Sequence, residues 1–142
     1  MPRLLLFRVG DLQYGLEIAA IQEVADDPPL YAIPQGGRHL LGAVNLHGRV
    51  LPVIDLPGLL GLDAAPRDPR LVVLGPECHS LVLAVSAIGR IVAFEAADLR
   101  LPTDEERGRA VAGVVAAGAL ADPVNLLDAG AVVERLETIY AV

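Results

Sequence analysis

Apolar residues in this chain fall into short runs separated by turn residues, a pattern that predicts a protein built mainly from β-strands. Leu4–Val9 and Gln13–Ile18 flank the turn signal Gly10-Asp11 and predict an N-terminal hairpin. Further strands are expected at Leu71–Leu74, Leu81–Val85, Ile88–Phe94, Ala110–Ala117 and Val124–Leu127. Only Ala129–Tyr140 places apolar residues at helical spacing, so a closing helix is predicted there.

The most informative stretch is a second predicted hairpin, Gly42–Leu56. Its turn is His47-Gly48, where a two-residue loop needs positive φ angles that Gly adopts freely and His tolerates. Pro52 has no N–H to donate to a sheet, so the second strand is expected to be an edge or to carry a bulge there. Asp55 ends the strand and is placed to cap the short segment that follows.

Polar and proline-containing stretches predict the loops. Asp26–Pro29 and Gln35–Gly37 are expected to be loop and turn, and Pro102–Arg109 to be a charged loop. Ala64–Pro69 is polar and expected to be exposed, which makes it the best candidate for a linker between two halves of the chain.

The chain also contains an internal regularity. At an offset of 67 residues, four apolar positions match four others: Leu16, Ile18, Ile21 and Val24 align with Leu83, Val85, Ile88 and Ile91. At an offset of 71 residues, Gly42, Val44, Pro52 and Val53 align with Gly113, Val115, Pro123 and Val124. A period this long with only two copies predicts a duplicated β unit, that is, two small barrels packed face to face.

Composition limits the classes of function. With 142 residues, of which 54% are hydrophobic and 4% aromatic, the chain has enough aliphatic surface for a dense core in one compact unit. The net charge is −7 and all eleven basic residues are scattered arginines, which disfavours nucleic acid as a partner. Cys78 is the only cysteine and fits a reducing compartment. The longest small and apolar run has twelve residues, against about 20 for a membrane span, so a cytoplasmic protein without membrane insertion is expected.

No reaction centre is predicted. Cys78-His79-Ser80 lies in a turn, where adjacent side chains rarely face each other, and no third orienting group is indicated. His39, His47 and His79 lie in separate segments without metal-ligand spacing, and glycine-rich nucleotide motifs are missing. We therefore predict no catalytic residue, no metal and no cofactor, and a protein that works by binding.

With its flanks, the second hairpin resembles the CheW-like domain, the adaptor module of bacterial chemosensory arrays. The matching segments, in order, are Phe7–Gly10, Tyr14–Ile18, Ile21–Val24, Ile33-Pro34, Gly42–Leu56, Leu83–Val85, Gly113–Val115 and Val124–Asp128. The hairpin is the most specific of them. Because the resemblance covers essentially the whole chain, one CheW-like domain spanning residues 1–142 is expected.

The resemblance implies a mainly β fold of two small, intertwined, five-stranded barrels similar to SH3 barrels, which share a hydrophobic core and end in a short helix. It also implies a non-catalytic adaptor that binds the regulatory domain of a CheA-type histidine kinase and the cytoplasmic tip of methyl-accepting chemoreceptors. Sheet edges and a groove between the barrels would hold these partners, in a pathway that controls chemotaxis, type IV pili or gliding. The alternative is a divergent CheW-like barrel module that regulates another protein or binds a ligand without kinase coupling.

The partner-binding residues that the resemblance implies are Glu23, Asn45, Leu46, His47, Gly48, Arg49, Val50, Pro52 and Asp55. His47 stands where the family usually has an arginine that works with the acid matching Glu23, and neutral histidine does not form a bidentate contact with a carboxylate. Arg49 is expected on the same side of the strand. A protonated His47 would strengthen an interaction with Glu23, so pH-sensitive partner binding is expected.

Overall fold

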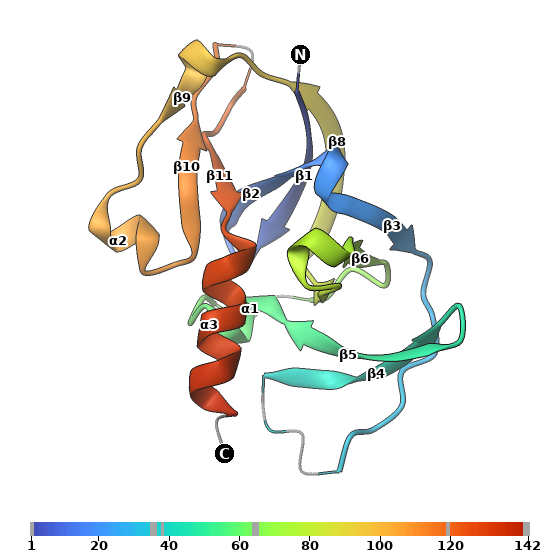
Figure 1. The fold of residues 1–142 in the computed structure, drawn as a ribbon. Coiled ribbons are helices and arrows are strands. Elements are labelled where there is room, and N and C mark those ends of the chain that lie inside the picture. Colours follow the sequence, from blue (N-terminus) through green and yellow to red (C-terminus); the bar gives the residue numbers. More distant parts are fainter. Residues whose placement is uncertain (1, 35–36, 38, 64–65, 119, 141–142) are drawn as a thin grey trace.

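The computed structural model describes residues 2–34, 37, 39–63, 66–118 and 120–140, and its strands form two sheets (Figure 1). The first sheet has the order β8-β1-β2-β11-β10-β9, from strands β1 (Arg3–Val9), β2 (Leu12–Glu17), β8 (Ala87–Ala93), β9 (Leu99–Arg100), β10 (Val111–Val115) and β11 (Val124–Leu127). The second has the order β3-β6-β7-β5-β4, from β3 (Ile21–Ala25), β4 (Leu40–Leu46), β5 (Arg49–Asp55), β6 (Leu71–Leu74) and β7 (Val82–Ala84). The helices are α1 (Leu56–Leu59), α2 (Asp104–Arg107) and α3 (Ala129–Ile139), and the 3₁₀ turns are η1 (Ile18–Ala20), η2 (Pro76–Cys78) and η3 (Ala96–Asp98).

The predicted mainly β fold with a closing helix is confirmed. The second sheet has the expected five strands, and the first gains a sixth, β9, which is only two residues long. Within the predicted charged loop the chain forms α2 instead of remaining irregular. Thr103 Oγ1 accepts a hydrogen bond from Glu106 N at 3.2 Å, and Glu106 Oε1 accepts one from Thr103 N at 2.9 Å. This reciprocal capping satisfies two backbone groups that a helix of this length leaves without partners.

The two sheets repeat one arrangement. At the offsets found in the sequence, β3 corresponds to β8, β6-β7 to β1-β2, and β4-β5 to β10-β11. Substituting these counterparts turns the order of the second sheet into β8-β1-β2-β11-β10, which is the first sheet without β9. The parallel pair β5–β7 likewise has its counterpart in the parallel pair β11–β2. The first copy comprises β1–β5, and the second comprises β6, β7, β8, β10 and β11. The first hairpin of each copy, β1-β2 or β6-β7, lies in one sheet with the last three strands of the other copy, so the two copies are intertwined.

The predicted linker at Ala64–Pro69 lies between the two copies along the chain, but it is not a boundary between the two sheets. Positions 64 and 65 lie outside the described residues. The described part, residues 66–69, connects α1 to β6, and the strands on either side of it, β5 and β6, both belong to the second sheet. The chain crosses between sheets at η1 and again between β7 and β8. Asp68 is only 8% exposed, because Arg70 and the Ile88 backbone N–H hydrogen bond to its carboxylate.

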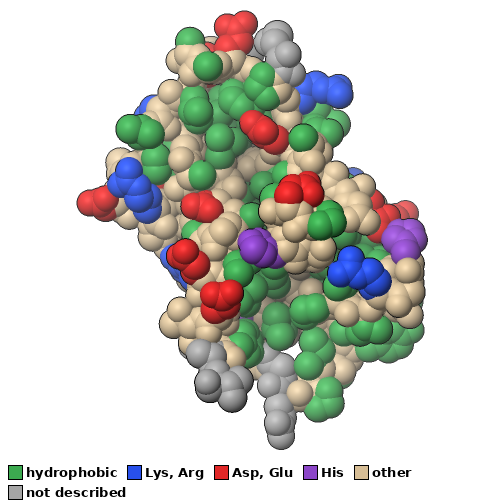
Figure 2. Space-filling view, viewed as in Figure 1, with side chains coloured by type: hydrophobic (Ala, Val, Ile, Leu, Met, Phe, Trp, Pro, Cys, Tyr) green, Lys and Arg blue, Asp and Glu red, His purple; other side chains and the backbone are tan. Residues whose placement is uncertain are grey.

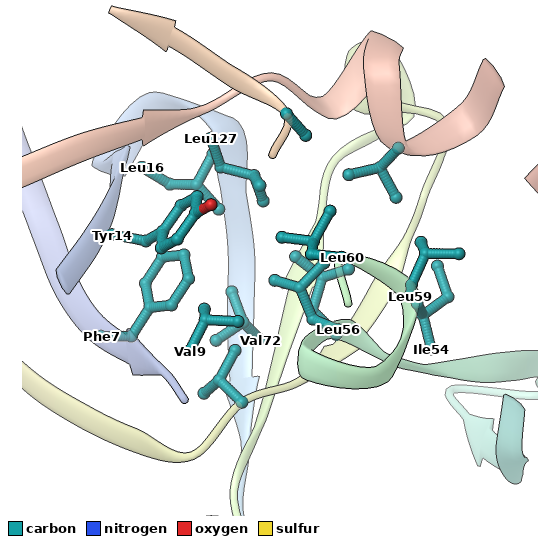
Figure 3. Close-up of a cluster of buried hydrophobic side chains, with 14 of the residues drawn as sticks. Phe7, Val9, Tyr14, Leu16, Ile54, Leu56, Leu59, Leu60, Val72 and Leu127 are labelled. Atoms are coloured by element: carbon teal, nitrogen blue, oxygen red, sulfur yellow. The ribbon is translucent and has the colours of Figure 1, made fainter. Parts of the chain in front are cut away.

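The buried side chains of the described residues form three clusters. The largest lies between the sheets (Figure 3) and consists of Leu5, Phe7, Val9, Tyr14, Leu16, Ile54, Leu56, Leu59, Leu60, Val72, Leu74, Leu83, Val85, Ala110, Val111, Val114, Leu127 and Val132. Each sheet also curls around a small core of its own, such as Leu4 and Leu6 in the first and Val82 and Ala84 in the second. Strands β1, β6 and β7 are thus covered on both faces, which explains why they appear as continuous apolar runs without alternation.

The second hairpin forms as predicted. His47 and Gly48 have φ angles of 53° and 83°, as a two-residue turn of this kind requires. Strand β5 pairs with β7 only from Val53 onward, so Pro52 needs no hydrogen-bond partner on that side. Asp55 caps α1 by accepting a hydrogen bond from Gly58 N at 3.5 Å.

A turn was also predicted at residues 35–37, of which positions 35 and 36 lie outside the described residues.

Candidate partner-binding surface

Glu23 and His47 meet although their strands lie far apart in the sheet. Strands β3 and β4 form opposite edges of the second sheet, yet His47 Nε2 lies 2.9 Å from Glu23 Oε1. Contact is made because the sheet curls until β3 reaches the β4–β5 turn (Figure 1). The His47 side chain is 73% exposed and that of Glu23 is 31% exposed, so water screens this pair and it stabilises the fold only slightly.

A small hollow of about 40 Å³ surrounds this contact, and we call its lining the turn site: Gln22, Glu23, Leu46, His47, Arg49, Leu51, Val73, Leu74 and Ser80. Small-molecule sites usually enclose about 300–1,000 Å³, so the hollow suits a side chain of a partner protein better than a ligand. Arg49 lies beside His47, as expected. Among the described residues it forms no ion pair, which leaves its guanidinium available to a partner.

The outer face of the same hairpin is apolar and exposed. Val50 is 70% exposed and lies opposite Asn45 in the β4–β5 register, and Pro52 is exposed on the same strand. Hydrophobic side chains cover much of the lower part of the face in Figure 2, over β4 and β5. An exposed valine at a hairpin tip has no packing role within the chain, so it is suited to a protein contact.

Asp55 lies away from this surface. It sits at the far end of β5 from the turn, where it caps α1 and lines a separate cavity of about 220 Å³ with Leu41 and Arg67. Six β-residues span about 20 Å, so the structure does not bring Asp55 together with His47. The residues predicted from the sequence therefore divide into three groups: Glu23, Leu46, His47 and Arg49 line the turn site, Asn45, Val50 and Pro52 lie on the outer face of the hairpin, and Asp55 lines a separate cavity.

A groove lies where strands β2, β10 and β11 of the first sheet meet the turns η1 and η2 and the start of α3. It has a volume of about 280 Å³, and we call it the inter-sheet groove; its lining is Gly15, Leu16, Glu17, Ala20, Cys78, Ala112, Leu126, Leu127, Asp128 and Ala129. Turn η2 connects it to the turn site, because Cys78 lines the groove and Ser80 lines the turn site. The resemblance implied a groove between the barrels, but none of these residues was predicted for it, since they come from five separate segments of the chain.

The Cys78–Ser80 turn lacks the geometry of a catalytic site. Cys78 and Ser80 line different hollows, and no hydrogen bond joins their side chains among those found in the described residues. Burial and the nearby Glu77 carboxylate raise the pKa of the Cys78 thiol, which disfavours the reactive thiolate. Within the described ranges no three His, Cys, Asp or Glu side chains cluster as a metal site requires. None of the helices described here has the length and apolar character needed to cross a bilayer.

Comparison with known proteins identifies the family. The model of the CheW-like domain matches residues 3–137. The chain belongs to the CheW-like domain family. This CheW-like chain is 34% identical over 104 residues to the chemotaxis protein CheW of Rhizobium meliloti, a match that covers 72% of the chain but only 66% of that relative. It is also 29% identical over 126 residues to protein FrzA of Myxococcus xanthus, covering 86% of the chain and 79% of FrzA.

A solved structure supports the fold. The crystal structure of the scaffolding protein TtCheW from Thermoanaerobacter tengcongensis superimposes with a TM-score of 0.75 at 22% identity, covering 89% of this chain and 88% of that one. At this identity the match establishes the architecture of the CheW-like chain.

Proposed function

We propose that this chain is a non-catalytic signalling adaptor, which couples chemoreceptors to a CheA-type histidine kinase in a bacterial chemosensory pathway. The observation that carries the proposal is the match to the CheW-like domain over residues 3–137. Relatives named for chemotaxis and the FrzA protein support a chemosensory role. The described surface is consistent with it, since it offers contact sites at the turn site and at the inter-sheet groove.

The mechanism is positional. Two sheets that share one core hold the turn site and the inter-sheet groove in a fixed relation, so two partners bound to them are held in register with each other. The partners in this proposal are the regulatory domain of the kinase and the cytoplasmic tip of the receptor. Phosphoryl transfer belongs to the kinase, and the adaptor acts in the cytoplasm without a cofactor.

Binding measurements against both partners test the proposal. The cognate kinase regulatory domain and a receptor-tip fragment are titrated onto the immobilised chain, and each is expected to bind. Val50→Glu should weaken at least one of them by tenfold or more, because it buries an unpaired charge in an apolar contact. Leu101→Glu is the matched control, since Leu101 is 82% exposed and follows β9 in the first sheet. Failure of both partners to bind the unaltered chain would favour the divergent binding module.

His47 gives a pH-dependent prediction. Protonation adds a charge to the contact with Glu23 and holds the turn in one conformation, so affinity for the receptor tip should increase as the pH falls from 8 to 5.5. The pair is exposed and contributes at most about 1 kcal/mol, which limits the increase to about fivefold. His47→Gln keeps a hydrogen-bonding side chain but does not titrate, and its profile should be flat. A flat profile for the unaltered chain would contradict the prediction.

A further inference from the structure

The cavity beside Asp55 lies at the end of β5 that points away from the turn site, and we call it the Asp55 cavity. Strands β5 and β7 run parallel here, with Asp55 opposite Ala84, and the chain leaves them in different directions. After β5 it forms α1 (Figure 1), whereas after β7 it crosses to β8 in the first sheet. In open α/β sheets, ligands bind where the chain diverges in this way beyond the carboxyl ends of parallel strands. The described residues that line the cavity are Leu41, Asp55, Pro57, Arg67, Ala84, Val85 and Ser86.

The Asp55 cavity is small, and four of its seven lining residues are apolar. Its volume is about 220 Å³, which is the room that about seven water molecules occupy in the liquid. Sites for drug-sized ligands enclose about 300–1,000 Å³, so this cavity suits only a small metabolite. Ala84 and Val85 are almost fully buried and form an apolar wall together with Pro57.

Two opposite charges line the cavity without pairing with each other. No ion pair in the described part of the chain includes Asp55 or Arg67. Asp55 Oδ1 accepts one long hydrogen bond, of 3.5 Å, from Gly58 N, and Arg67 Nη1 donates one of 3.1 Å to the backbone oxygen of Asp68. Most of the hydrogen-bonding capacity of both charged groups is therefore left for a ligand, and hydrogen bonds to charged groups are the strong ones.

Ser86 adds a hydroxyl to the same cavity. Its Oγ accepts a hydrogen bond from Gly10 N at 3.0 Å, and Gly10 belongs to the turn between β1 and β2. This bond holds Ser86 against the first sheet. A hydroxyl that accepts a hydrogen bond still has its own proton to donate, so Ser86 is suited to an anionic oxygen.

We propose that the Asp55 cavity binds a small zwitterion, a class that includes the α-amino acids with short aliphatic side chains. The ammonium group of the ligand lies against the Asp55 carboxylate, and its carboxylate accepts hydrogen bonds from Arg67 and Ser86. Its apolar part packs on Ala84 and Val85. A molecule with only one charge leaves one of the two charged side chains without a partner, so the site selects for both charges together. The inference goes beyond the proposed function, and it can hold or fail whether or not the kinase and the receptor bind.

Three ligands of similar shape test the requirement for two charges. L-Valine carries both, its decarboxylated analogue isobutylamine lacks the carboxylate, and its deaminated analogue isovalerate lacks the ammonium group. Each is titrated into the full chain, and binding is followed through the backbone amide shifts in two-dimensional NMR spectra. L-Valine should bind at least about tenfold more tightly than either analogue, because each analogue loses a hydrogen bond between charged groups. The shifts should be largest at Ala84, Val85 and Ser86. Equal affinities of the three ligands, or shifts that do not saturate, would overturn the proposal.

Neutral variants assign each charge of the ligand to one side chain. Asp55→Asn preserves a residue that caps α1, and it should weaken L-valine about tenfold while isovalerate binds as before. Arg67→Gln changes an exposed side chain, and it should weaken L-valine to a similar degree while isobutylamine binds as before. The matched controls, Asp63→Asn and Arg90→Gln, remove the same charges at exposed positions outside the cavity and should bind like the unaltered chain. If L-valine kept its advantage over both analogues in Asp55→Asn and Arg67→Gln, the proposal would be wrong.

Discussion

Truncating Leu83 to alanine should lower the free energy of unfolding by about 3 kcal/mol and destabilise both sheets. Leu83 is in β7 of the second sheet and is fully buried, at 0% exposed. Its side chain belongs to the shared core with Phe7, Tyr14 and Leu127, which come from the first sheet. A cavity at this position therefore removes contacts from both sheets at once.

Urea unfolding and hydrogen exchange measure the two parts of this expectation. Backbone amides of β1, in the first sheet, should lose as much protection as those of β6, beside Leu83 in the second. Leu101→Ala makes the same chemical change at a residue that is 82% exposed, and it should leave both quantities nearly unchanged. If the β1 amides of Leu83→Ala kept their protection from hydrogen exchange, the two sheets would be separate folding units, which would contradict a single domain that spans the chain.

Most strands were predictable because each one carries its own local signal. Turn residues at Gly10-Asp11 and His47-Gly48 delimit hairpins whose pairing is local, and both hairpins form as expected. The pairing of β1 with β8 is different, since these strands lie more than 70 residues apart and no local pattern specifies which edge each will meet. The internal repeat predicted two similar units but not that they exchange strands. The sequence separation between matching residues of the two copies is the same whether or not the copies are intertwined.

The candidate site divides in the same way. The hairpin residues were found because its turn has a distinctive chemistry, and the resemblance pointed to the contact between Glu23 and His47. Ala20, Ala112 and Leu126 were not assigned to the groove, since alanine and leucine in separate segments give no sign that they line a common surface. The segment containing Asp68 was predicted to be an exposed linker, because composition does not distinguish a buried, fully hydrogen-bonded carboxylate from a solvated one.

Replacing Asp68 by asparagine should cost about 2 kcal/mol of folding stability at neutral pH. The Asp68 carboxylate accepts hydrogen bonds from Arg70 N, Nε and Nη2 at 2.9, 3.0 and 2.9 Å, and from Ile88 N at 2.8 Å. These bonds tie the segment before β6 to the start of β8, that is, one sheet to the other. Asparagine has one acceptor oxygen and no charge, so part of this network is left without a partner.

The folding stability lost in Asp68→Asn should depend on pH, and the contact between Asp68 and Arg70 determines the direction of this dependence. Hydrogen bonding to Arg70 lowers the pKa of Asp68 from 3.8 to about 2, so the folded state favours the ionised carboxylate. The stabilisation is complete above about pH 5 and disappears as the pH falls through 3.8 toward 2. A shift of this size corresponds to about 2.5 kcal/mol, which we reduce to about 2 because the Arg70 side chain is 44% exposed.

Urea unfolding from pH 7 down to pH 2 tests the origin of this stability. The difference between the unaltered chain and Asp68→Asn should shrink from about 2 kcal/mol at neutral pH to nearly zero at the acid end, because protonation removes from Asp68 the charge that the variant already lacks. Asp63→Asn, at an exposed aspartate, controls for the loss of one negative charge and should follow the unaltered chain throughout. A difference that stays constant with pH would mean that altered packing, and not the ionised carboxylate, joins the two sheets at this point.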